Sequence, residues 1–183
     1  MTSMHRLALV VGLSAGPLSD SVEARPPRQA TNRCAGQTAC AEVPTFVATI
    51  IEVRAGAGAT LAVTVRFTNK TPRPLVVGYT DGSGAATDGR GNRLLFVPAA
   101  VQGIGIISRS GFDPKLTLQP GASGDARFEF GGSGGGGGDA ATSTWDLELT
   151  IREIDPVANH QYKLGKEHPL QFRGLRVARG SPD

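Results

Sequence analysis

The segment WDLELTIR, residues 145–152, is the part of the sequence that decides the fold class. Its apolar residues, Trp145, Leu147, Leu149 and Ile151, occupy every second position. Because successive side chains of a β-strand point to opposite faces, this alternation predicts a strand with one face in a core and the other in water.

The same signal recurs along the chain. Residues 60–68 alternate in the same way, residues 46–53 form a β-branched run, and further short strands are expected at 75–79, 93–97, 103–107, 115–118, 125–130 and 170–177, with residues 162–164 a weaker candidate for one more. The 25 Gly and 12 Pro of the 183 residues separate these runs with turn signals and argue against long helices. We therefore expect an all-β protein, an immunoglobulin-like antiparallel β-sandwich of about eight or nine strands.

Three regions differ in composition. Residues 1–24, with His5 and Arg6 before a short apolar run and Val22-Glu23-Ala24 at its end, are typical of an export signal. Residues 25–44 form a leader rich in Pro and Arg, and residues 45–180 form the sandwich domain. Within that domain, residues 131–143 are expected to be a mobile loop, because polyglycine buries no side chain.

The two cysteines, Cys34 and Cys40, lie in the leader. Two thiols this close in an exported chain are expected to form a disulfide that ties the leader down. A zinc site usually needs four ligands and a redox-active pair has two intervening residues, so both alternatives are less favoured.

Residues 46–130 resemble bacterial secreted immunoglobulin-like domains of the kind grouped as DUF4352-like. The resemblance is carried by the strand that ends at Asn69, by Pro74 and Leu75 in the next strand, by the hairpin of residues 88–93, and by Gln119-Pro120-Gly121 before the strand at 126–130. It implies the sandwich fold and a location outside the cytoplasm. These domains share no catalytic residues, so none is expected here on that ground.

Candidate chemistry is sparse in the sequence. Asp155, His160, Glu167 and His168 would form a hydrolytic or metal-binding cluster only if their segments met, and histidines exposed in loops are the simpler expectation. Asp81, Asp88, Asn92 and Asp113 supply the oxygens that calcium prefers, but without the spacing of a dedicated loop, and Asp or Asn beside Gly is also what tight turns require. We predict no catalytic residue, no metal site and no cofactor.

The segment around residues 101–107 is the best candidate for a partner-binding element. Val101, Ile104, Ile106 and Ile107 are apolar and are flanked by glycine. As a sheet edge this strand would be a template for strand addition from a partner. As an inner strand it would belong to the core.

These observations predict a non-catalytic exported module, periplasmic or extracellular, that binds another envelope or extracellular protein or a surface. The alternatives are a structural or chaperone-like subunit that pairs through strand edges, with self-assembly possible, and an enzyme accessory or carbohydrate-binding domain. The net charge of +3 arises from bases scattered among acids, so nucleic-acid binding is not expected. Membrane insertion of the mature chain is not expected either.

Overall fold

The structure is a computed structural model, and it describes residues 34–56, 60–132, 144–157 and 161–177. These residues belong to one compact unit, Asn32–Asp183. The expected export signal, residues 25–33 of the leader, most of the polyglycine loop and His160 lie outside the described residues.

The described residues form an all-β fold, as the alternation predicted. Twelve strands run in chain order: β1 Cys40–Glu42, β2 Phe46–Gly56, β3 Thr60–Asn69, β4 Leu75–Thr80, β5 Ala85–Asp88, β6 Arg93–Phe96, β7 Gly105–Ser108, β8 Gly111–Phe112, β9 Leu116–Leu118, β10 Ser123–Gly131, β11 Thr144–Pro156 and β12 Tyr162–Arg176. A short 3₁₀ turn at Pro98–Ala100 is the one helical element in this part of the chain.

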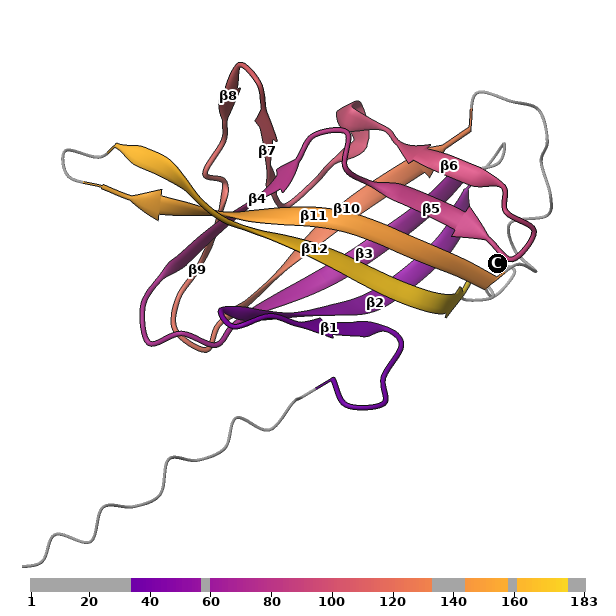
Figure 1. The fold of residues 1–183 in the computed structure, drawn as a ribbon, viewed down its shortest axis with the longest axis horizontal. Helices are drawn as coiled ribbons and strands as arrows, with labels where there is room; N and C mark the ends of the chain where they lie inside the picture. The colour runs from indigo at the N-terminus through magenta and orange to yellow at the C-terminus, as the bar shows by residue number, and fades with distance from the viewer. Residues whose placement is uncertain (1–33, 57–59, 133–143, 158–160, 178–183) are drawn as a thin grey trace, which may run out of the picture. The chain divides into compact units, whose positions relative to one another are not determined.

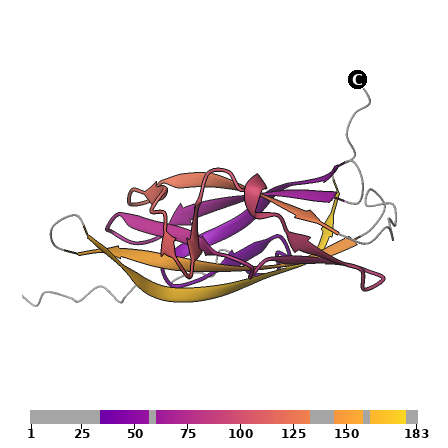
Figure 2. The same ribbon diagram turned by 90° about the horizontal axis from the view of Figure 1, so that it is seen from above.

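The strands form two layers, which Figures 1 and 2 show from two directions. One layer contains β1, β2, β3 and β10 in that order. In the other, β12 pairs with β11, and β11 pairs with β5 along Trp145–Glu148 and with β4 along Ile151–Glu153. Strand β6 pairs with both β5 and β10 and so connects the two layers at one side.

The core between the layers contains the residues that the alternation predicted. Trp145, Leu147, Leu149 and Ile151 are all at most 3% exposed, whereas Asp146 and Glu148 point to solvent. The four Phe side chains of β2, β3 and β10 that face them are completely buried (Phe46, Phe67, Phe128 and Phe130). Burial of each large apolar side chain contributes about 1.5–3 kcal/mol relative to exposure.

The pairing differs from the expected antiparallel pattern at one place. Strand β7 runs parallel to β4, from the pair Gly78–Gly105 to the pair Thr80–Ile107. The Ile107 side chain of β7 packs with Val76 and Ile154 in a second, smaller core on the outer face of this layer, and Phe112 packs against that core. A Cβ atom at Gly78 would lie 2.8 Å from Ile107, so glycine allows this close cover.

Three strands were not expected from the sequence. Strand β1 lies in the leader, β8 is only two residues long, and β5 falls in a segment rich in turn signals. Strand β1 pairs with β2 from Cys40–Thr49 to Glu42–Val47, so the end of the leader is part of the sandwich.

Candidate functional site

The predicted disulfide between Cys34 and Cys40 is present in the structure, with the two Cα atoms 5.2 Å apart. The disulfide closes a short loop. Two backbone carbonyls of this loop accept hydrogen bonds from strands of the two layers. The Ile50 amide donates to the Ala39 carbonyl at 2.8 Å, and the Arg173 amide of β12 approaches the Thr38 carbonyl at 3.4 Å. The disulfide therefore constrains a loop that connects β2 with β12.

The expectation that His168 is exposed to water is wrong. His168 lies on β12 with 4% of its surface exposed, and its ring packs edge-on against Phe46 at 5.4 Å. Its Nε2 atom lies 2.7 Å from Oε1 of Glu153, and the Thr45 hydroxyl donates to the same oxygen at 2.8 Å. Strand alternation explains the burial, since His168, Leu170 and Phe172 lie at every second position.

This cluster has the wrong order for nucleophilic catalysis. In a triad the histidine lies between the nucleophile and the acid. Here the Glu153 carboxylate lies in the middle and accepts from both Thr45 and His168. Asp155 and Glu167 do not join it: Glu167 lies 3.8 Å from Arg152, and the Asp155 carboxylate lies beside Gly165. The cluster joins β11 and β12 to the residue that precedes β2.

The four candidate calcium residues are not gathered into one site. Asp88 and Asn92 share a turn, in which the Asp88 carboxylate accepts from the amides of Arg90 and Asn92 and from the Asn92 side chain. Desolvation opposes the charge on Asp88, but these hydrogen bonds outweigh it and lower the pKa of Asp88. No group of three or more His, Cys, Asp or Glu side chains that could hold a metal ion occurs within the described residues.

The predicted partner-binding edge is not an open edge. Strand β7 pairs with β4 on one side and with β8 on the other. Ile104 and Ile107 are 2% and 5% exposed, and Val101 and Ile106 are partly buried against the core. Strand addition at these residues would have to displace β8. In the structure this segment therefore belongs to the core. A binding role for these residues stays a prediction.

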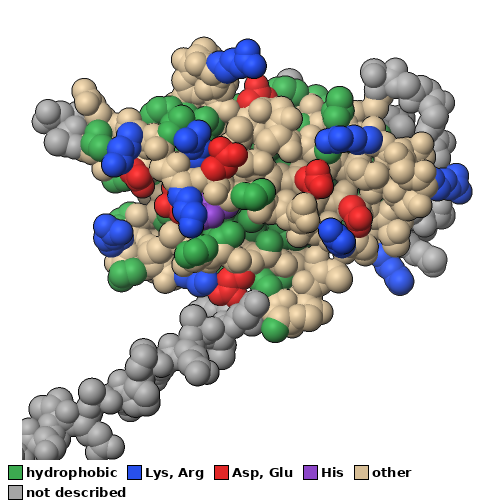
Figure 3. All heavy atoms as spheres, viewed as in Figure 1, with side chains coloured by type: hydrophobic (Ala, Val, Ile, Leu, Met, Phe, Trp, Pro, Cys, Tyr) green, Lys and Arg blue, Asp and Glu red, His purple; other side chains and the backbone are tan. Residues whose placement is uncertain are grey.

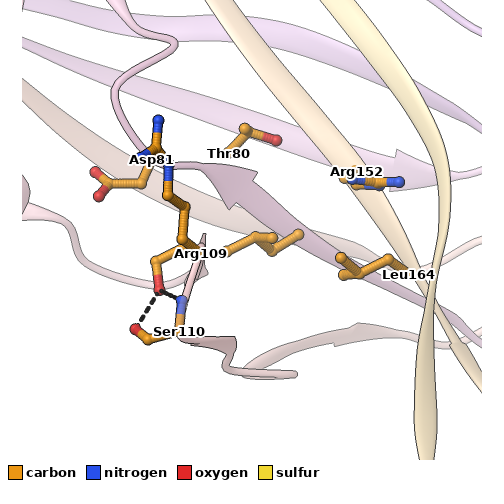
Figure 4. A pocket seen from close by; sticks show the side chains of 8 residues that line it. Thr80, Asp81, Arg109, Ser110, Arg152 and Leu164 are labelled. Atoms are coloured by element: carbon orange, nitrogen blue, oxygen red, sulfur yellow. Dashed lines mark hydrogen bonds between the residues drawn. The ribbon is translucent and has the colours of Figure 1, made fainter.

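A pocket of about 580 Å³ lies beside this segment, on the outer side of the β4 layer. Its lining comes from the end of β4, the β7–β8 turn and the β11–β12 hairpin: Thr80, Asp81, Ile107, Ser108, Arg109, Ser110, Arg152 and Leu164. Figure 4 shows Arg109 and Asp81 on one side of the pocket and Arg152 and Leu164 on the other. Its size is in the range of small-molecule or side-chain binding sites.

The second small core positions the pocket. Ile107, which also lines the pocket, packs with Ile154 and Val76 beneath it. The Asp81 amide donates to the Ile107 carbonyl at 2.9 Å and holds the end of β4 against β7. The Thr80 hydroxyl is buried in the pocket wall and has no hydrogen-bond partner among the described residues.

An apolar arm extends from one side of the pocket. In the described pairing, Ile154, Asp155 and Pro156 of β11 pair with β12 alone, and Figure 1 shows this hairpin extending past β4. Large apolar side chains are exposed there: Val157 at 38%, Tyr162 at 41% and Leu164 at 38%. We call these three residues the hairpin patch.

The sequence did not indicate this site. Residues 162–164 are a weak strand signal, and Arg109 lies in a segment expected to be a loop. The pocket arises because the parallel pairing of β4 and β7 brings the β7–β8 turn beside the β11–β12 hairpin.

Comparisons with known proteins do not assign this chain to a family. No family model matches the sequence, and no curated protein is significantly similar to it. A solved structure of the ASH / PapD-like domain of human CEP192 (PapD-like domain 7) is similar at 11% identity and a TM-score of 0.30, covering 75% of this chain and 92% of that chain. No helix within the described residues is long and apolar enough to cross a membrane.

Proposed function

We propose that this chain is a non-catalytic exported binding module, which binds a protein partner through the hairpin patch and the adjoining pocket. The observation that supports this proposal best is the distribution of exposed apolar side chains. Six large hydrophobic residues are exposed in the described part of the chain, and Val157, Tyr162 and Leu164 of the hairpin patch are three of them. Apolar side chains gathered on a projecting element are typical of an interaction site.

The composition of this region supports a role as a protein interface. Tyr and Arg are enriched among the residues that dominate binding energies, particularly beside a pocket that excludes water. Tyr162 and Leu164 lie two positions apart on β12, Leu164 lines the pocket, and Arg109 and Arg152 line it as well. Tyr162 and Leu164 therefore share a face of β12, and Leu164 lines the same pocket as the two arginines.

Export is supported by the disulfide. Disulfides form and persist in oxidising compartments such as the periplasm or the exterior. The Cys34–Cys40 bond is compatible with such a location, and the apolar run before residue 24 is typical of an export signal.

The proposal is tested by capturing the partner protein from an envelope extract and comparing which variants of this chain retain it. Full-length chains carrying Tyr162→Ser or Leu164→Ser are compared with Ile51→Ser and Leu95→Ser, which remove exposed apolar side chains from β2 and β6. We expect the wild type and both control variants to retain the same partner and the two hairpin variants to lose it. Equal capture by all five chains, or loss only in the control variants, would contradict the proposal.

A further inference from the structure

The pocket contains a guanidinium group that the fold leaves unused. Arg109 lies in the β7–β8 turn, is exposed, and forms no ion pair or side-chain hydrogen bond with the other described residues. The neighbouring serines are engaged with each other, with the Ser108 and Ser110 hydroxyl oxygens 3.0 Å apart. The turn thus fixes the backbone at Arg109 and leaves the side chain available to a ligand.

A second guanidinium lines the opposite wall. The Arg152 Nε atom donates to the Gly165 carbonyl at 3.1 Å, and its Nη1 atom lies 3.8 Å from the Glu167 carboxylate. Because Arg has five N–H donors, these contacts leave part of the guanidinium free. Arginine in the lining favours an anionic group in the pocket, and a carboxylate matches the planar fork of arginine.

The pocket also limits how much negative charge it accepts. Asp81 lies on the same side as Arg109 (Figure 4), and its carboxylate repels a second negative charge. The lining side chains carry two positive charges and one negative charge, and Glu167 beside Arg152 offsets part of the positive charge. This balance suits a single carboxylate better than a phosphate of about −1.5 to −2.

The apolar side chains of the lining indicate which kind of group the ligand carries beside its carboxylate. Leu164 and Ile107 line the pocket, and Tyr162 lies on the same face of β12 as Leu164, farther along the hairpin. A ligand whose carboxylate reaches Arg109 therefore has an apolar surface of the same pocket beside it. An acidic residue two positions from an apolar residue in an extended peptide presents this combination of groups on one face.

We infer that the pocket binds an Asp or Glu side chain of a partner protein, with a neighbouring apolar side chain packed against Leu164 and Tyr162. This inference rests on the proposed function and names the chemistry of the partner segment. A membrane surface is a poorer fit, because lipid recognition uses clustered bases. Acidic and basic side chains are interleaved over the visible face in Figure 3.

The test titrates the isotope-labelled full-length chain with the capped peptide Ac-Ala-Glu-Ala-Leu-NH₂ and follows the chemical shifts of the backbone amides. We expect shifts at Ser108–Ser110, Arg152 and Leu164, and binding weaker by about tenfold or more for the peptide with Gln in place of Glu. Arg109→Gln should abolish the difference between the peptides. The matched control Arg93→Gln, an exposed arginine on β6, should preserve it.

Further arms of the same titration separate other ligands. Equal binding of the Glu and Gln peptides, no binding of either, or an unchanged preference in Arg109→Gln would overturn the inference. So would tighter binding of a phosphoserine peptide, or of phosphatidylglycerol vesicles, in an Arg109-dependent way. If partner capture depends on Tyr162 and Leu164 while the peptides show no preference for Glu, the inference fails and the proposed function stands.

Discussion

Glu153 and His168 are bonded across the β11–β12 pair, with 2.7 Å between Oε1 of Glu153 and Nε2 of His168, and Thr45 donates to the same oxygen. The Glu153 side chain is 14% exposed and that of His168 only 4%. One carboxylate thus satisfies two polar groups from separate parts of the fold. Its removal would leave both groups without this acceptor in a poorly solvated place.

We therefore expect Glu153→Ala to lower the free energy of unfolding by about 2 kcal/mol or more, because a buried polar group left without a partner costs about 1–3 kcal/mol. Urea denaturation measures this. Glu148→Ala, on the exposed face of the same strand, is the control and should change stability by less than about 0.5 kcal/mol. Equal, small losses in both variants would show that the cluster does not stabilise the fold.

Asn69 is the second buried polar residue with a clear role. At 1% exposure, its side-chain amide donates to the carbonyls of Arg73 and Leu118, and its Oδ1 atom accepts from the amide and hydroxyl of Thr71. Asn69→Ala should destabilise the protein by about 2–4 kcal/mol, since these four bonds organise the β3–β4 turn. Thermal unfolding beside the exposed control Gln119→Ala checks this, and similar midpoints for the two variants would contradict it.

The turn at Asp88 should give stability a pH dependence. The pKa of Asp88 is lowered in the folded state from an ordinary value of 3.8, so the unfolded chain takes up the proton first as the pH falls. The ionised Asp88 carboxylate contributes fully to the free energy of unfolding above its ordinary pKa. This contribution is lost as the pH falls through the lower pKa that Asp88 has in the folded state. The stability gap between wild type and Asp88→Asn should therefore be constant from pH 7 to 5 and narrow below pH 4. A gap that widens on acidification would contradict this account.

The close approach of Gly105 to Asp113 fixes the base of the β7–β8 hairpin. A Cβ atom at Gly105 would lie 1.8 Å from the Asp113 carbonyl oxygen, which is a backbone atom. Gly105→Ala should therefore displace the hairpin, cost about 2 kcal/mol or more, and raise amide exchange at residues 105–112. Gly89→Ala, where the nearest atom is the Thr144 hydroxyl at 3.3 Å, is the control. Unchanged exchange in Gly105→Ala would contradict the packing described for this hairpin.

The sequence predicted the parts of the fold that rest on local patterns. The alternation at Trp145–Ile151 and the cysteine spacing gave the buried face of β11 and the disulfide, and both are present. Strand β5 was missed because Ala85 and Ala86 have weak strand preference, and their strand forms by pairing with β11 and β6. The strand preferences of individual residues therefore did not predict which strands pair in the folded protein.

The site could not be predicted for the same reason. His168 follows Glu167 in a charged segment that was expected to be a loop. Because β12 continues through this segment, His168 lies on the buried face of the strand beside Glu153. Arg109 and Leu164 are 55 positions apart in the sequence, and the parallel pairing of β4 with β7 brings both to one pocket. Parallel pairing of neighbouring short strands leaves no periodic signal in the sequence.

The most direct measurement of the central claim is hydrogen exchange of the full-length chain with and without the partner isolated by capture. If the hairpin patch and the pocket form the binding surface, amides of residues 108–111 and 161–165 should become protected when the partner is bound. Residues 93–96 of β6, which carry the exposed Leu95, should exchange unchanged. Protection confined to β6, or to the disulfide loop at residues 34–40, would place the partner elsewhere and contradict the proposed binding surface.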